Sequence, residues 1–138
     1  MTRMTTKDVK QWLWQARGIE REIQGLYLTR DKEFDRVTAT TSKLTGETIS
    51  GTMDPHKYDR LTELNETIDR LTDELTSKKA EILSSIYCLK DSRFRQVLKL
   101  YYVDCMTLEQ IAVQMNYSFQ HISRLKYEAV IALKDAQQ

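Results

Sequence analysis

The chain has 138 residues, a length that suits a single domain or a small domain with an extended arm. Its net charge is +1 and no segment is strongly basic, so charge by itself does not draw the chain to nucleic acid. Four glycines, one proline and 41% hydrophobic residues, with almost no alternation of apolar and polar positions, predict an all-α protein.

Residue types that carry catalysis or bind metals are sparse and scattered. Cys88 and Cys105 show no CxxC spacing and no nearby histidine, which argues against a disulfide framework or a zinc site. His56 and His121 lie beside no nucleophile motif, and no glycine-rich phosphate loop is present. No apolar run approaches the roughly 18 residues that span a bilayer, and no signal peptide is visible. We therefore expect a cytoplasmic protein with no enzymatic activity, metal, cofactor or membrane partner.

Residues 5–37 are predicted to form a first long helix. Thr5 and Asp8 have the spacing of a capping box, which satisfies free N–H groups at a helix start. Apolar residues then recur every three or four positions, as in a coiled-coil seam. The members of this stripe are Val9, Trp12, Ala16, Ile19, Ile23 and Leu26, and Leu13, Trp14 and Tyr27 widen it near its start and end.

A second long helix is predicted at residues 58–89, after a flexible loop rich in threonine, serine and glycine at about 38–57. The two long helices can fold back on each other as an antiparallel hairpin, or each can pair with a second chain in a coiled coil. The sequence leaves open whether the arm is an intramolecular hairpin or a homodimer through the N-terminal helices. The apolar stripe of the second helix consists of Leu61, Leu64, Ile68, Leu71, Leu75, Ile82, Ile86 and Leu89.

Residues 91–138 are predicted to form a tri-helical domain that follows an arm at residues 1–90. Its first helix spans 93–103 and buries Phe94, Val97, Leu98 and one of the two adjacent tyrosines. The last two helices have helix-turn-helix spacing, because Asn116 falls where the turn needs a residue that tolerates positive φ. The buried stripe of these two helices comprises Leu108, Ile111, Ala112, Met115, Ile122, Leu125, Ala129 and Leu133.

The polar face of the last helix is the candidate site for binding double-stranded DNA. If Ile122 points inward, Gln120, Arg124 and Tyr127 point away from the core. Glutamine can pair with adenine and arginine with guanine in the major groove. Hydroxyls at the helix starts can cap the helix or contact phosphate. The candidate DNA-binding residues are Thr107, Ser118, Phe119, Gln120, His121, Ser123, Arg124 and Tyr127.

The run from Arg93 to Leu133 resembles region 4 of the sigma-70 family. The resemblance rests on an arginine-bearing first helix, on the stretch Thr107 to Ala112, on Asn116 to Ser118 and on the helix end Glu128 to Leu133. It covers about the last third of the chain, and no segment that would match region 2 is present. With its long helical N-terminal part, the chain is similar to small phage and prophage regulators of the RinA and ArpU type. That resemblance implies control of late or lytic genes.

Three functions therefore remain open. We expect a sequence-specific transcriptional regulator that binds DNA through the last helix and that dimerises or docks on RNA polymerase through its arm. A DNA packaging factor of the small-terminase kind also combines helix-turn-helix and coiled-coil parts. The third is an adaptor that binds RNA polymerase without reading DNA itself, for which an outward-facing Ile131 is the supporting feature.

Overall fold

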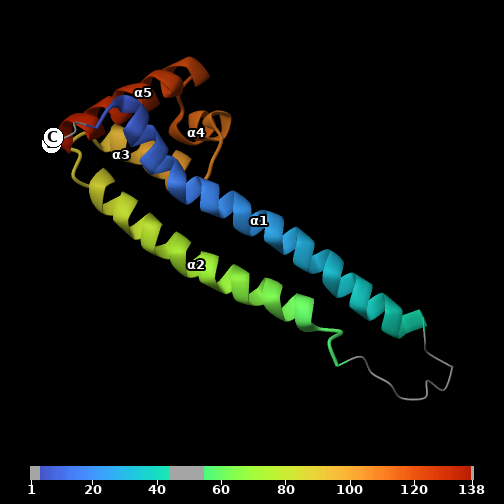
Figure 1. Ribbon diagram of the computed structural model, residues 1–138. Coiled ribbons are helices and arrows are strands. Elements are labelled where there is room, and N and C mark those ends of the chain that lie inside the picture. The colour runs from blue at the N-terminus through green and yellow to red at the C-terminus, as the bar shows by residue number, and fades with distance from the viewer. Residues whose placement is uncertain (1–3, 44–54, 138) are drawn as a thin grey trace. The chain divides into compact units, whose positions relative to one another are not determined.

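The computed structural model describes residues 4–43 and 55–137, and within these residues it is helical and contains no strand (Figure 1). The long helices are α1 (Thr6–Lys43) and α2 (Asp59–Ile86). The C-terminal part contains α3 (Ser92–Leu98), the π-helical segment η1 (Lys99–Val103), α4 (Leu108–Met115) and α5 (Phe119–Ala136). The predicted all-α class is confirmed for the described residues. None of their helices is long and apolar enough to cross a membrane.

The described residues belong to two compact units. One, here called the end unit, lies within Met1–Ile19 and Leu75–Gln138, and the other, the middle unit, lies within Glu20–Glu74. Both long helices therefore contribute to both units. The sequence predicted a boundary at residue 90 between an arm and a DNA-binding domain. That assignment of separate roles to the two parts stays a prediction. The compact units themselves do not follow that boundary.

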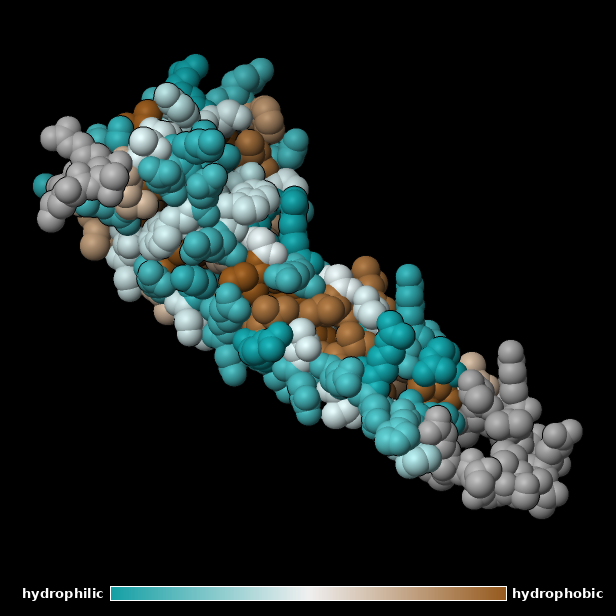
Figure 2. Space-filling model, in the orientation of Figure 1, coloured by the Kyte–Doolittle hydropathy of each residue, from teal (hydrophilic) through white to brown (hydrophobic). Residues whose placement is uncertain are grey.

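The core of the end unit lies where α3, α4 and α5 pack together. All four positions predicted for the inner stripe of α5 are buried, and Val130 joins them. In the space-filling view hydrophilic side chains cover most of the visible helix surface, with hydrophobic residues between them (Figure 2). This is the distribution expected of amphipathic helices. The core cluster consists of Val97, Leu100, Ile111, Ala112, Ile122 and Leu125.

A π-helical turn interrupts the helix that was predicted to run regularly over 93–103. The backbone N–H of Asp104 donates to the carbonyl of Lys99 at 3.0 Å, and the two side chains form an ion pair at the same distance. A π turn holds an extra residue, so the inward positions shift along the helix. Leu100 is consequently buried, and of the two tyrosines predicted as alternatives Tyr102 is the buried one, whereas Phe94, also predicted to be buried, is half-buried.

The beginning of α1 packs into the end unit. Thr5 and Asp8 form the predicted capping box, with N···O distances of 2.9 and 3.2 Å. Val9 and Ala16 are fully buried, as the predicted stripe requires. Leu13 is also fully buried and lies between them, whereas Trp12 is half-buried. The inward face of α1 is thus centred one residue away from the predicted seam.

Within the middle unit, α1 and α2 of the same chain lie side by side (Figure 1). Arg30 Nη1 donates to Asn65 Oδ1 at 3.4 Å, and Ile23, Val37 and Ile68 are buried. This contact joins two helices of one chain. A homodimer through the same helices stays a prediction.

The predicted loop at about 38–57 starts too early. α1 continues to Lys43, and Thr38 Oγ1 donates to the carbonyl of Phe34 at 2.8 Å, so its side chain is compatible with the helix. Residues 44–54 of the predicted loop lie outside the described residues. A turn at 55–58 precedes α2. The helix itself begins at Asp59, one residue later than predicted.

Candidate nucleic-acid interface

The turn between α4 and α5 fixes the direction of the candidate recognition helix. Asn116 adopts the left-handed conformation predicted for it, with φ 60° and ψ 43°. The N–H of Tyr117 donates to the carbonyl of Ala112 at 3.0 Å, which closes the end of α4. Ser118 is extended, with φ −71° and ψ 159°, and starts α5. Three residues thus separate two helices, and α5 leaves the turn in a defined direction.

Both hydroxyl residues predicted to start helices act as N-caps. Thr107 Oγ1 accepts from the N–H of Gln110 at 3.2 Å, and the Gln110 side chain accepts from the N–H of Thr107 at 2.9 Å. Ser118 Oγ accepts from the N–H of His121 at 3.1 Å. Each hydroxyl keeps its own O–H as a donor, and both residues are exposed. Their caps therefore leave them able to contact a phosphate.

The outer face of α5 carries the exposed members of the predicted site. Gln120 and Arg124 are exposed and lie one turn apart, and Tyr127, 56% exposed, follows on the same side. Phe119, at the first position of α5, is 45% exposed. The structure therefore brings these four side chains to solvent near one another along the helix.

Two predicted site residues are less accessible. His121 is half-buried, and its ring contacts that of Tyr117 edge to face, with centroids 4.5 Å apart. This contact gives His121 a packing role within the turn. Ser123 is also half-buried and lines a cavity beside α5.

Sequence reasoning missed a cationic group that the fold assembles behind α5. Arg17 of α1 donates from Nη1 to the carbonyls of Tyr101 and Met106, at 2.9 and 3.3 Å. Its guanidinium lies 4.2 Å from the centroid of the Tyr101 ring, and the Lys126 ammonium lies 4.3 Å from the same centroid. Periodicity could not reveal this group, because its members come from opposite ends of the chain.

The electrostatic environment of Lys126 reflects that crowding. Burial lowers the pKa of its ammonium, and the nearby charges of Lys10 and Arg17 lower this pKa further. A half-buried cation beside two others is costly unless an anion compensates it. Within the described residues, no group of three or more His, Cys, Asp or Glu side chains is placed to hold a metal ion.

These features define an all-helical protein. A three-residue turn, with Asn116 in the left-handed conformation, orients its last helix so that the polar face of that helix is exposed to solvent. The chain belongs to the family described as "Protein of unknown function (DUF1492)", whose profile matches residues 28–134. The match runs from within α1 almost to the end of α5 and so includes the turn at Asn116. A search of curated proteins and a search of solved structures each found no match.

Proposed function

We propose that the protein is a sequence-specific DNA-binding transcriptional regulator in which α5 enters the major groove. The observation that carries the proposal is the left-handed turn at Asn116 between two packed helices. Ile122 and Leu125 anchor α5 in the core, while Gln120 and Arg124 on the same helix are exposed. This arrangement is typical of a recognition helix, which contacts bases through its N-terminal residues.

The exposed side chains match the chemistry of base edges. Arg124 can donate two hydrogen bonds to O6 and N7 of guanine, and Gln120 can pair with N6 and N7 of adenine. The first turn of α5 leaves backbone N–H groups without helical partners, and Ser118 adds a hydroxyl. Together these donors suit a phosphate on the rim of the groove.

The resemblance to sigma-70 region 4 supports the same function and narrows its context. It favours a phage- or prophage-encoded regulator of late or lytic genes that acts in the cytoplasm. A net charge of +1 supplies little non-specific attraction to DNA. We therefore propose that a second copy, paired through the N-terminal helices, or RNA polymerase provides the remaining affinity.

The test is capture of genomic and prophage fragments by the purified full chain at about 0.15 M salt. We expect the wild type to retain a few fragments. Arg124→Ala should bind these fragments about fivefold to 150-fold more weakly, since a bidentate base contact contributes about 1–3 kcal/mol. Arg70→Ala removes the same charge from an exposed position of α2 in the middle unit and is the matched control. Equal loss in both variants would contradict base reading by Arg124.

An adaptor that binds RNA polymerase without reading DNA is the second candidate. Ile131, expected to face outward, is half-buried and gives this candidate less support than expected. Val113 on α4 is 79% exposed and supports it instead, because an exposed aliphatic side chain can contact a protein partner. Retention of RNA polymerase together with no retention of DNA would favour the adaptor. A ring-sized mass in solution would instead favour the packaging factor.

A further inference from the structure

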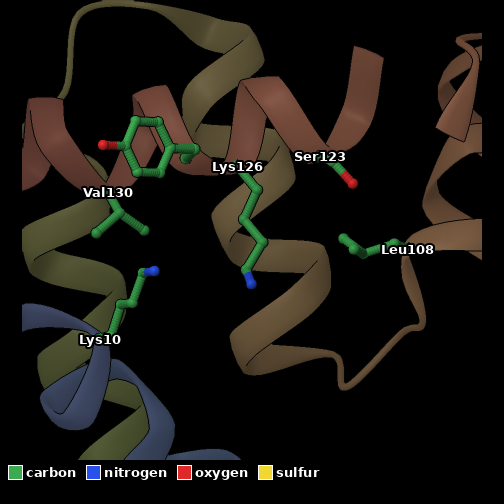
Figure 3. Close-up of a pocket in the computed structure, with 6 residues that line it drawn as sticks. Lys10, Leu108, Ser123, Lys126 and Val130 are labelled. Atoms are coloured by element: carbon green, nitrogen blue, oxygen red, sulfur yellow. The ribbon is translucent and has the colours of Figure 1, made fainter. Parts of the chain in front are cut away.

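A cavity of about 200 Å³ lies in the end unit, where α1, α4 and α5 meet. Lys10 of α1 and Lys126 of α5 both extend into this space, and Leu108 approaches it from the start of α4 (Figure 3). The cavity therefore has two lysine side chains among its walls, together with two residues that carry a hydroxyl group. Its lining consists of Lys10, Leu108, Ser123, Lys126, Tyr127 and Val130.

The positive charge of Lys10 acts on Lys126, and no carboxylate is among the residues that line the cavity. Among the described residues, the Lys10 ammonium lies 5.9 Å from the centroid of the Tyr127 ring, the Lys126 ammonium lies 4.3 and 5.8 Å from those of Tyr101 and Tyr102, and neither lysine is in an ion pair. Arg17 adds a third positive charge that acts on Lys126. Like charges that face one cavity repel each other, and a bound anion would remove that repulsion.

The position of the cavity on α5 indicates which anion it receives. Ser123 and Tyr127 line it, and Tyr127 also lies on the exposed side that carries Gln120 and Arg124. A helix in the major groove has a sugar-phosphate backbone along each side, and lysine and hydroxyl groups are common phosphate ligands there. A group beside the reading face is therefore placed to meet phosphate when that face meets bases.

We propose that this cavity binds a phosphate of the DNA backbone between Lys10 and Lys126, with the hydroxyls of Ser123 and Tyr127 as further donors. The inference rests on the proposed function and extends it to α1. The beginning of α1 then serves as part of the DNA interface as well as part of the core. It fixes the position of α5 along the duplex, whereas Gln120 and Arg124 read the sequence.

The test compares Lys10→Gln with the wild type on a retained DNA fragment over a range of salt concentrations. Lys10 is exposed, so its replacement is compatible with folding, and an unchanged circular dichroism melting curve verifies this. Loss of one phosphate contact should reduce the slope of log affinity against log salt by about 0.9, which corresponds to about fivefold weaker binding at 0.15 M salt. Lys90→Gln, which removes an exposed charge between α2 and α3, should leave the slope unchanged.

The outcomes separate the two proposals. A reduced slope in Lys10→Gln, with the wild-type slope kept in Lys90→Gln, supports the phosphate site. Equal slopes in all three proteins overturn the phosphate site and leave DNA reading by α5 intact. If the wild type retains no DNA, both proposals fail, and the lysines would then be tested against an acidic segment of a protein partner.

Discussion

Replacing Arg17 should weaken the packing of the beginning of α1 against the C-terminal helices of the end unit. Its guanidinium donates to the carbonyls of Tyr101 and Met106, which lie on either side of the end of the π-helical segment. The same group lies over the Tyr101 ring at 4.2 Å. A single side chain thus donates to two carbonyls and contacts an aromatic ring. The hydrogen-bond partners lie 84 and 89 residues away in the sequence.

The expected loss in the free energy of unfolding follows from these contacts. A hydrogen bond from a charged donor contributes about 1.5–3 kcal/mol, and a partly exposed cation–π contact adds about 0.5–1 kcal/mol. The 3.3 Å bond is the weaker one, and removing Arg17 also relieves its repulsion with Lys126. We therefore expect Arg17→Ala to lower the free energy of unfolding by about 2–3 kcal/mol. Arg17→Lys keeps the charge but lacks the planar fork and should lose about half as much.

Urea unfolding followed by circular dichroism measures this difference. Lys32→Ala removes one positive charge from an exposed position of α1 in the middle unit and serves as the control. Surface substitutions of that kind change stability by about 0.5 kcal/mol or less. An Arg17→Ala variant as stable as Lys32→Ala would refute the anchoring role, and equal losses in Arg17→Ala and Arg17→Lys would show that the fork geometry is irrelevant.

Three further predictions concern the turn, the helix cap and a buried tyrosine. Asn116→Gly should keep wild-type stability, because glycine adopts positive φ freely, whereas Asn116→Ala should cost about 1–2 kcal/mol; comparable melting temperatures for both would contradict this. Ser118→Ala should cost about 1 kcal/mol in urea unfolding through loss of the bond from the His121 N–H, and no loss would show that the cap is dispensable. Burial raises the pKa of Tyr102 to about 12, so the folded chain keeps a proton that the unfolded chain loses above about pH 10. Stability should fall between pH 10 and 12 by about 2 kcal/mol more in the wild type than in Tyr102→Phe, and parallel curves would count against it.

Local signals in the sequence predicted the parts of the fold that depend on neighbouring residues. The two capping boxes and the left-handed Asn116 involve groups within about one helical turn, so residue type and spacing determine them. The inner stripe of α5 was likewise visible, because burial of one face leaves a repeat of three and four residues.

Features that depend on tertiary packing could not be predicted from the local sequence. Leu13, predicted only to widen the stripe of α1, is fully buried, whereas Trp12 in the heptad pattern is half-buried. The beginning of α1 contacts both η1 and α5, so a two-helix seam is too narrow a description. The π turn at Lys99–Val103 leaves Leu100 buried together with Tyr102, whereas helical periodicity, which assumes a constant number of residues per turn, predicted one of the two tyrosines but not Leu100. α1 also continues past Thr38. The low helix propensity of this threonine does not end the helix, because the rest of α1 already supports it.

In the candidate site, too, the features that depend on neighbouring residues could be predicted and those that depend on tertiary packing could not. Gln120 and Arg124 were predicted correctly to be exposed, since a helix face follows from its buried stripe. The grouping of Lys10, Arg17 and Lys126 joins α1 to α5, and no short-range pattern relates residues so far apart.

That grouping also changes how the net charge should be interpreted. A charge of +1 averages over the whole chain, whereas attraction for a phosphate depends on the charges within about a Debye length, roughly 8–10 Å, of the binding position. Three cations converge near one cavity, and burial together with their mutual repulsion lowers the pKa of Lys126. If the cavity binds phosphate, Lys126→Gln should weaken DNA binding while it leaves stability equal or raises it, because it removes a half-buried repulsive charge. A lysine retained only for its contact with Tyr101 would show the opposite, lower stability with unchanged affinity, and measuring both quantities in one variant decides between the two roles.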